Sequence, residues 1–171
     1  LIKSGAGTIT LSGNNTYTGT TTISEGTIKL GASSTTNASS PTGTTGRITV
    51  SSGAALDMNG FSYTSSHTQP ITINGTGVGG LGAITNSSGT ASTLIGPITF
   101  NTAASIEGEG ALLNITGTPV SGTTAITIGG AVGGSITSVI AGGRNLIKEN
   151  EVSSEARRKQ RWIKRRQRPP S

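Results

Sequence analysis

A short alternation of apolar and polar residues recurs along the chain and predicts β-strands with one buried and one solvent-facing side. These segments are rich in Ile, Val and Thr, whose branched side chains suit a pleated sheet. Clusters of Gly, Asn and Ser separate the segments and interrupt any helical pattern. The predicted strands cover residues 8–11, 27–30, 47–50, 71–73, 98–100 and 126–128.

The predicted strands recur at a spacing typical of a solenoid. Their first isoleucines follow one another at intervals of 19, 20, 23, 27 and 28 residues, at Ile9, Ile28, Ile48, Ile71, Ile98 and Ile126. A period of about 20–30 residues indicates coils that stack on one another. A single coil has too little apolar surface for a core, but stacked coils share a continuous one. The sequence therefore predicts an all-β fold, a right-handed parallel β-helix.

An antiparallel β-sandwich is the competing architecture. Asn59-Gly60 and Asn74-Gly75 are dipeptides that favour tight hairpins between antiparallel strands. The intervals between the predicted strands are mostly long and irregular, and this fits the corners of a coil better than hairpins. We therefore favour the β-helix.

Composition and charge divide the chain into two parts. Leu, Ile, Val and Phe number 35 of 171 residues, close to the level at which chains become disordered. Disorder also requires a high net charge, but residues 1–150 carry five basic and five acidic side chains. The whole net charge of +6 lies in residues 151–171. We therefore predict a β-helical region at residues 1–148 and a separate basic tail at residues 149–171.

The basic tail has two interpretations. Ser153 or Ser154 is suited to cap a helix that runs to about Gln167 and ends before Pro169. The alternative, which we favour, is that a frame change or a truncated gene supplies the segment and that it has no role in the β-helix. A helical tail would bind a polyanion, either nucleic acid or an anionic membrane surface. The residues for that binding are Arg157, Arg158, Lys159, Arg161, Lys164, Arg165, Arg166 and Arg168.

Several classes of site and segment are excluded or unsupported by composition. The chain has no cysteine, so disulfides, thiolate metal sites and cysteine nucleophiles are excluded. No run approaches the roughly 18 apolar residues of a membrane-spanning helix. The first residues, Leu1-Ile2-Lys3, read as sequence from the middle of a domain. We expect the chain to be a fragment of a longer protein.

Residues 5–31 carry a more specific pattern and read GAGTITLSGNNTYTGTTTISEGTIKLG. This stretch resembles the autotransporter-associated β-strand repeat of bacterial passenger domains. In that family a Gly-x-Gly-Thr-Leu-Thr-Leu strand, a Gly-x-Asn-x-Tyr-x-Gly turn and a Gly-Thr-Leu strand follow one another. The chain departs from the pattern only by Ile9 and Ile28 in place of Leu.

The resemblance continues over roughly residues 1–148. Residues 77–86 and 96–100 resemble the sequence found between such repeats. The motif Leu146-Ile147-Lys148 repeats Leu1-Ile2-Lys3, and this predicts the start of a second repeat.

The turn of the repeat is expected to be structural, and its residues are Gly13, Asn14, Asn15, Tyr17 and Gly19. Gly and Asn tolerate left-handed backbone conformations, which we expect here. We expect Tyr17 to supply a large apolar contact at a corner. An asparagine of the turn is expected to pair with backbone groups that the bend leaves open.

The resemblance implies a rigid stalk or adhesin segment at the surface of a Gram-negative bacterium. Its implied partners are host or cell-surface glycans or proteins. It also implies that the parent protein is anchored in the outer membrane by a C-terminal β-barrel translocator, which this chain lacks. A β-helical carbohydrate-active enzyme is the alternative.

Candidate catalytic chemistry is sparse, and we expect neither enzyme activity nor a cofactor or metal. Glu107 and Glu109 form the only candidate carboxylate pair, and a bend at Gly108 would separate them. His67 is the single histidine and has no neighbouring ligand in sequence. The glycine-rich stretch at residues 79–84 lacks the aspartate of a calcium-binding repeat, because Ile84 stands in its place.

Overall fold

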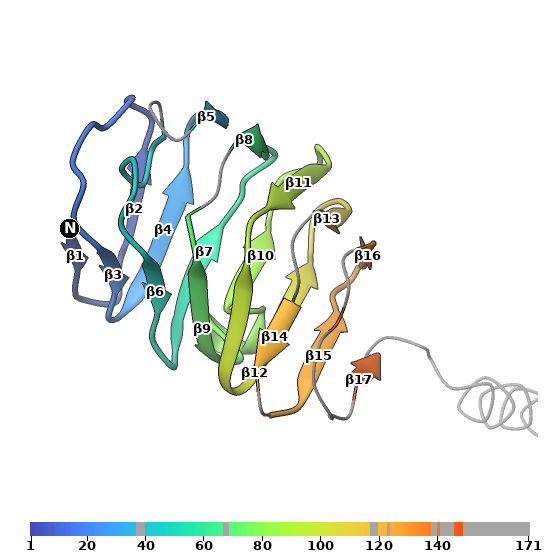
Figure 1. The fold of residues 1–171 in the computed structure, drawn as a ribbon. Coiled ribbons are helices and arrows are strands. Elements are labelled where there is room, and N and C mark those ends of the chain that lie inside the picture. The colour runs from blue at the N-terminus through green and yellow to red at the C-terminus, as the bar shows by residue number, and fades with distance from the viewer. Residues whose placement is uncertain are drawn as a thin grey trace, which may run out of the picture.

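The computed structural model describes residues 1–36, 40–66, 69–116, 120–122, 124–137, 140 and 146–148. Within them the chain winds into successive coils, which follow one another from β1 at one end to β17 at the other (Figure 1). All pairings between the named strands are parallel. The predicted parallel β-helix is therefore confirmed, and the antiparallel sandwich is wrong.

Strands of successive coils form three stacks, of which the first has a regular outer face. It contains β1 (Ile2–Lys3), β3 (Thr21–Ile23), β6 (Ile48–Val50), β9 (Ile71–Gly75), the first part of β12 (Ile98–Gly108) and β14 (Val120–Gly122). Buried and partly exposed residues alternate along its strands. Its outward row is made of threonines in register: Thr22, Thr49, Thr72 and Thr99.

The second stack differs because its outer face is covered in the middle. It contains β2 (Thr8–Leu11), β4 (Gly26–Leu30), β7 (Ala54–Asp57), β10 (Ile84–Asn86), the second part of β12, β15 (Ile126–Gly129) and β17 (Leu146–Lys148). Every residue of β7 and β10 is buried, as are the last five of β12. Its outward row mixes charged and hydroxyl side chains: Thr10, Lys29, Asp57, Thr85 and Glu107.

The third stack closes each coil. It contains β5 (Ser34–Thr36), β8 (Tyr63–Ser66), β11 (Ser92–Ile95), β13 (Leu113–Thr116) and β16 (Gly134–Ile136). Its inward side chains are in register from coil to coil, as Tyr63, Leu94 and Ile115 show.

The inward side chains of the three stacks form one continuous core. Each strand adds one or two medium-sized apolar side chains that stack on those of the neighbouring coils. Phe100 and Tyr63 are the largest fully buried side chains. A core with so few large residues is stable because every coil shares it with the next.

The register corrects the sequence-based period. The six predicted strands exist, but Ile9 and Ile28 lie in the second stack whereas Ile48, Ile71 and Ile98 lie in the first. The true second-stack row runs through Ile9, Ile28, Leu56, Ile84, Ile106 and Ile128. One coil therefore takes as few as 19 residues, from Ile9 to Ile28, and as many as 31, from Tyr63 to Leu94.

The two Leu-Ile-Lys motifs also prove not to be equivalent. β1 pairs within the first stack, whereas β17 pairs with β15 in the second stack. The second motif therefore does not mark the same position of a repeat as the first.

The two Asn-Gly dipeptides lie at corners of the coil and not in hairpins. Asn59 has a φ of 50° and donates from Nδ2 to the carbonyl of Leu30 at 2.9 Å. Asn74 donates to the carbonyl of Val50 at 2.9 Å and accepts from Asn101 at 2.9 Å. Each amide therefore satisfies a neighbouring coil at a bend, the role that was predicted for asparagines of the repeat turn.

One corner is much longer than the others. Between β9 and β10 the chain forms a short 3-10 helix, η1 (Val78–Gly80), and an isolated bridge joins Gly77 to Gly82. No helix was predicted here from the sequence. Among the residues that the structure describes, none of the helical segments is long and apolar enough to cross a membrane.

Candidate binding groove and the repeat turn

The repeat turn rests on the corner of the following coil. Asn15 donates from its backbone amide to the carbonyl of Ser40 at 3.1 Å and from Nδ2 to that of Pro41 at 2.7 Å. Tyr17 is half-buried, and its ring lies so close to Gly43 that a side chain there would clash with it. The predicted roles of Tyr17 and of a turn asparagine are therefore confirmed, with Asn15 as the asparagine. Asn14 is exposed.

The expected left-handed conformations of the turn are wrong. Positive φ values occur neither at Gly13 and Gly19 nor at the turn asparagines. The demand for glycine falls instead on positions that meet the backbone of a neighbouring coil. A Cβ at Gly46 would clash with the backbone of Gly19, and one at Gly26, where φ is 68°, would clash with the carbonyl of Gly7.

A chain of buried hydroxyl groups ties the turn to the next two coils. The hydroxyl of Tyr17 lies 2.6 Å from Thr21 Oγ1, which donates to the carbonyl of Thr42 at 2.9 Å. Thr42 Oγ1 lies 2.7 Å from the hydroxyl of Tyr63 and donates to Gln69 Oε1 at 3.3 Å. Because these groups are hydrogen-bonded, the polar interior is compatible with a stable core.

Burial affects the tyrosines of this network. It raises the pKa of Tyr63 far above its usual value, and the hydrogen bonds to Thr42 and Ser40 only partly oppose it. Burial also raises the pKa of Tyr17, and the hydrogen bond to Thr21 again opposes the shift. Both phenols therefore act as neutral structural groups near neutral pH.

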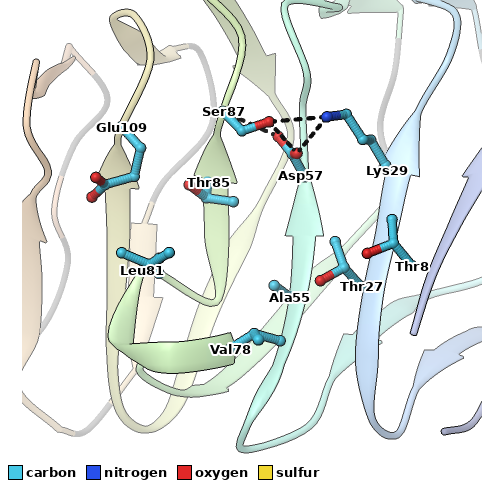
Figure 2. Close-up of a pocket in the computed structure, with 11 residues that line it drawn as sticks. Thr8, Thr27, Lys29, Ala55, Asp57, Val78, Leu81, Thr85, Ser87 and Glu109 are labelled. Carbon is cyan, nitrogen blue, oxygen red and sulfur yellow. Dashed lines mark hydrogen bonds and ion pairs between the residues drawn. The ribbon is translucent and has the colours of Figure 1, made fainter. Parts of the chain in front are cut away.

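A groove of about 240 Å³ lies on the outer face of the second stack. Its floor combines two rows of register partners, Thr8 with Thr27 and Ala55, and Lys29 with Asp57 and Thr85. The long corner around η1 supplies one wall with its aliphatic side chains, and Ser87 and Glu109 lie at the far end (Figure 2). The wall side chains are Val78 and Leu81, which are 38% and 54% exposed.

Asp57 is the best-anchored polar group of the groove. It accepts hydrogen bonds from the backbone amides of Asn59 and Ser87 at 2.9 and 3.0 Å and from Ser87 Oγ at 2.5 Å. Lys29 forms an ion pair with it at 3.6 Å and donates to Ser87 Oγ at 3.2 Å (Figure 2). These contacts fix one polar end of the groove.

Thr85 occupies the middle of the groove. It is 8% exposed, and its Oγ1 is buried without a hydrogen-bond partner. Figure 2 shows Thr85 between Glu109 on one side and the cluster of Ser87, Asp57 and Lys29 on the other. A buried hydroxyl without a partner is rare in folded proteins and calls for an explanation.

The candidate carboxylate pair is divided as its glycine suggested. Glu107 lies on β12, is 5% exposed and packs beneath Gly82 of the long corner. Glu109 lies beyond the end of β12 and lines the groove. The two glutamates therefore do not share one strand. Within the described ranges, no three His, Asp or Glu side chains gather as metal ligands do.

Some predicted site residues lie outside the residues that the structure describes. His67 is one of them. The basic tail at residues 149–171 is another, with Arg157, Arg158, Lys159, Arg161, Lys164, Arg165, Arg166 and Arg168. The boundary after residue 148 and polyanion binding by the tail remain predictions.

Sequence reasoning missed the groove itself. Lys29, Asp57 and Thr85 are 28 residues apart and belong to three coils, so no local motif joins them. A signal was available in the second-stack register, which places polar residues in one outward row. That row becomes visible only when coil lengths of 19 and 28 residues are both allowed.

Comparison with known proteins gives one match. No curated protein and no solved structure is significantly similar to the chain. Residues 1–30 match the model of the passenger-associated-transport-repeat family, and these residues form the first two coils up to the end of β4. The match covers the strand, the asparagine-rich turn and the closing strand described above. The chain therefore carries an autotransporter passenger repeat at residues 1–30.

Proposed function

We propose that the chain is a rigid β-helical segment of an autotransporter passenger and forms part of a stalk or adhesin. The passenger repeat implies a secreted or cell-surface protein. The observation that carries the proposal is the unbroken register of parallel strands, which runs from β1 to β17 with one shared core.

This architecture suits a spacer because its length and stiffness have a simple origin. Each coil adds roughly 4.8 Å along the axis, the separation of hydrogen-bonded strands. Bending the rod would stretch hydrogen bonds in all three stacks and open the core between coils. A stalk of this kind holds an adhesive surface at a fixed distance from the cell.

The first stack offers a plain outer surface for weak, repeated contacts. Its outward threonines, from Thr22 to Thr99, repeat once per coil and are partly exposed. A row of hydroxyls on a rigid rod suits multivalent hydrogen bonding to glycans or proteins on other cells. In the parent protein, we place this segment outside an outer-membrane anchor of a Gram-negative bacterium.

A β-helical carbohydrate-active enzyme is less well supported. The groove has two carboxylates, but Asp57 is occupied by three hydrogen bonds and the ion pair with Lys29. A group held in this way is better suited to supporting the groove than to transferring a proton. We therefore propose no catalytic role.

Spin-label distance measurements test the stalk. Thr22→Cys and Ser121→Cys place labels on the outward row of the first stack, four coils apart. We expect one narrow distribution that corresponds to about 19 Å between the Cα atoms. Thr22→Cys with Thr49→Cys, one coil apart, is the matched control. A broad distribution for the long pair beside a narrow one for the short pair would contradict a rigid stalk.

A further inference from the structure

The hydroxyl of Thr85 is the feature that the stalk does not explain. A threonine on the outer face of a β-helix normally bonds to water, as the exposed row of the first stack can. Thr85 is instead buried under the rim of a groove, and its Oγ1 has no partner among the described residues. A stalk would be at least as stable with Val at this position. The hydroxyl therefore has the character of a ligand contact.

The groove around Thr85 is nearly neutral and has both polar and aliphatic walls. Lys29 and Asp57 offset each other, and Ser87 bridges them. Glu109 contributes a second hydrogen-bond acceptor on the opposite side of Thr85 (Figure 2). Exposed aliphatic carbons from the long corner face the same space. This combination suits a ligand with many hydroxyl groups and one apolar face.

The same features argue against other classes of ligand. A metal ion is disfavoured because no three carboxylate or imidazole ligands gather in the described residues. An anion is disfavoured because the groove has two carboxylates and one ammonium group. A wholly apolar ligand would leave the hydroxyl of Thr85 unbonded.

The size of the groove limits the ligand to a small unit. Pockets for drug-sized molecules measure roughly 300–1,000 Å³, and this groove measures about 240 Å³. We propose that the groove binds one neutral sugar unit of a glycan, whose hydroxyls bond to Thr85 and Glu109 and whose C–H face packs on Leu81. This inference rests on the proposed adhesive function and assigns a site to it.

Saturation-transfer difference NMR on the full chain tests the site. The probes are the methyl glycosides of glucose, galactose and mannose, each at millimolar concentration. We expect at least one glycoside to bind and Thr85→Val to weaken that binding about five- to tenfold, which is the effect of one lost hydrogen bond. Thr99→Val, the same change on the outer face of the first stack, should leave binding unchanged.

A second variant guards against a folding defect. Glu109→Gln changes a half-buried bend residue outside the strands and should also weaken binding. The site is wrong if no glycoside binds the wild-type chain, or if Thr85→Val and Glu109→Gln both bind as tightly as wild type. In either case the spin-label distances would still stand as an independent test of the stalk.

Discussion

The first and second stacks have the same interior and different exteriors. Both bury Ile, Leu or Val in register on the inward side. The first stack exposes a repeated threonine on the outward side, whereas the second buries charged and hydroxyl residues there. The cause is the long corner between β9 and β10, whose residues line the groove on the second stack. A solenoid can thus keep its core unchanged while one extended corner creates a site.

Core substitutions should affect both stacks alike and give the largest effects. Ile71→Ala in the first stack and Ile84→Ala in the second both remove a fully buried side chain. Each should lower the free energy of unfolding by about 2–5 kcal/mol, measured by urea denaturation. A much smaller loss in one stack would show that the core is not continuous.

Corner glycines should separate the two stacks. Gly53 and Gly82 both have positive φ, at 79° and 97°. A Cβ at Gly53 would meet open space, so Gly53→Ala should cost about 1–2 kcal/mol from backbone strain alone. A Cβ at Gly82 would meet the carbonyl of Ile84 at 2.6 Å and the side chain of Glu107 at 2.8 Å. Gly82→Ala should therefore cost more in thermal and urea unfolding, and equal costs would contradict the packed long corner.

Polar groups on the outer faces should also differ in their value. Asp57→Asn removes the ion pair with Lys29 and weakens the acceptor for three hydrogen bonds. It should cost about 1–3 kcal/mol in urea unfolding. Thr72→Val removes the exposed acceptor of Arg47 on the first stack and should cost less than about 0.5 kcal/mol. The reverse order would mean that the outer face of the second stack is solvated.

The smallest expected effect is a gain. Thr85→Val replaces a buried hydroxyl that has no partner, and should raise the free energy of unfolding by up to about 1 kcal/mol in the absence of ligand. Thr99→Val should leave stability nearly unchanged because that hydroxyl is partly exposed. Destabilisation by Thr85→Val in urea unfolding would indicate that the hydroxyl is hydrogen-bonded.

The sequence predicted the fold but only part of the strands. Segments such as Ile48–Val50 and Ile126–Gly129 alternate Ile with Thr and stand out by their period of two. The third stack was missed because Ser34–Thr36 and Tyr63–Ser66 have almost no apolar residues to alternate. These strands exist because each pairs with the strand of the next coil, and that pairing is set by the whole coil and not by the local sequence.

The candidate site was less predictable than the fold. The repeat turn could be identified because Asn15 and Tyr17 lie in one short motif. The groove could not, because corners of variable length bring Lys29, Asp57 and Thr85 into one row. Gly26 and Gly46 show the same limit, since close backbone approach between coils requires glycine there.

Cysteine cross-linking tests the parallel register, on which the comparison of the stacks depends. The chain has no cysteine, so engineered pairs have no background. Thr72 and Thr99 are direct partners in neighbouring coils, at a separation of about 4.8 Å that a disulfide can span. Thr49 and Thr99 are two coils apart, at roughly twice that distance, which is too far for a disulfide. The account predicts that Thr72→Cys with Thr99→Cys oxidises readily and that Thr49→Cys with Thr99→Cys does not; the opposite pattern would contradict it.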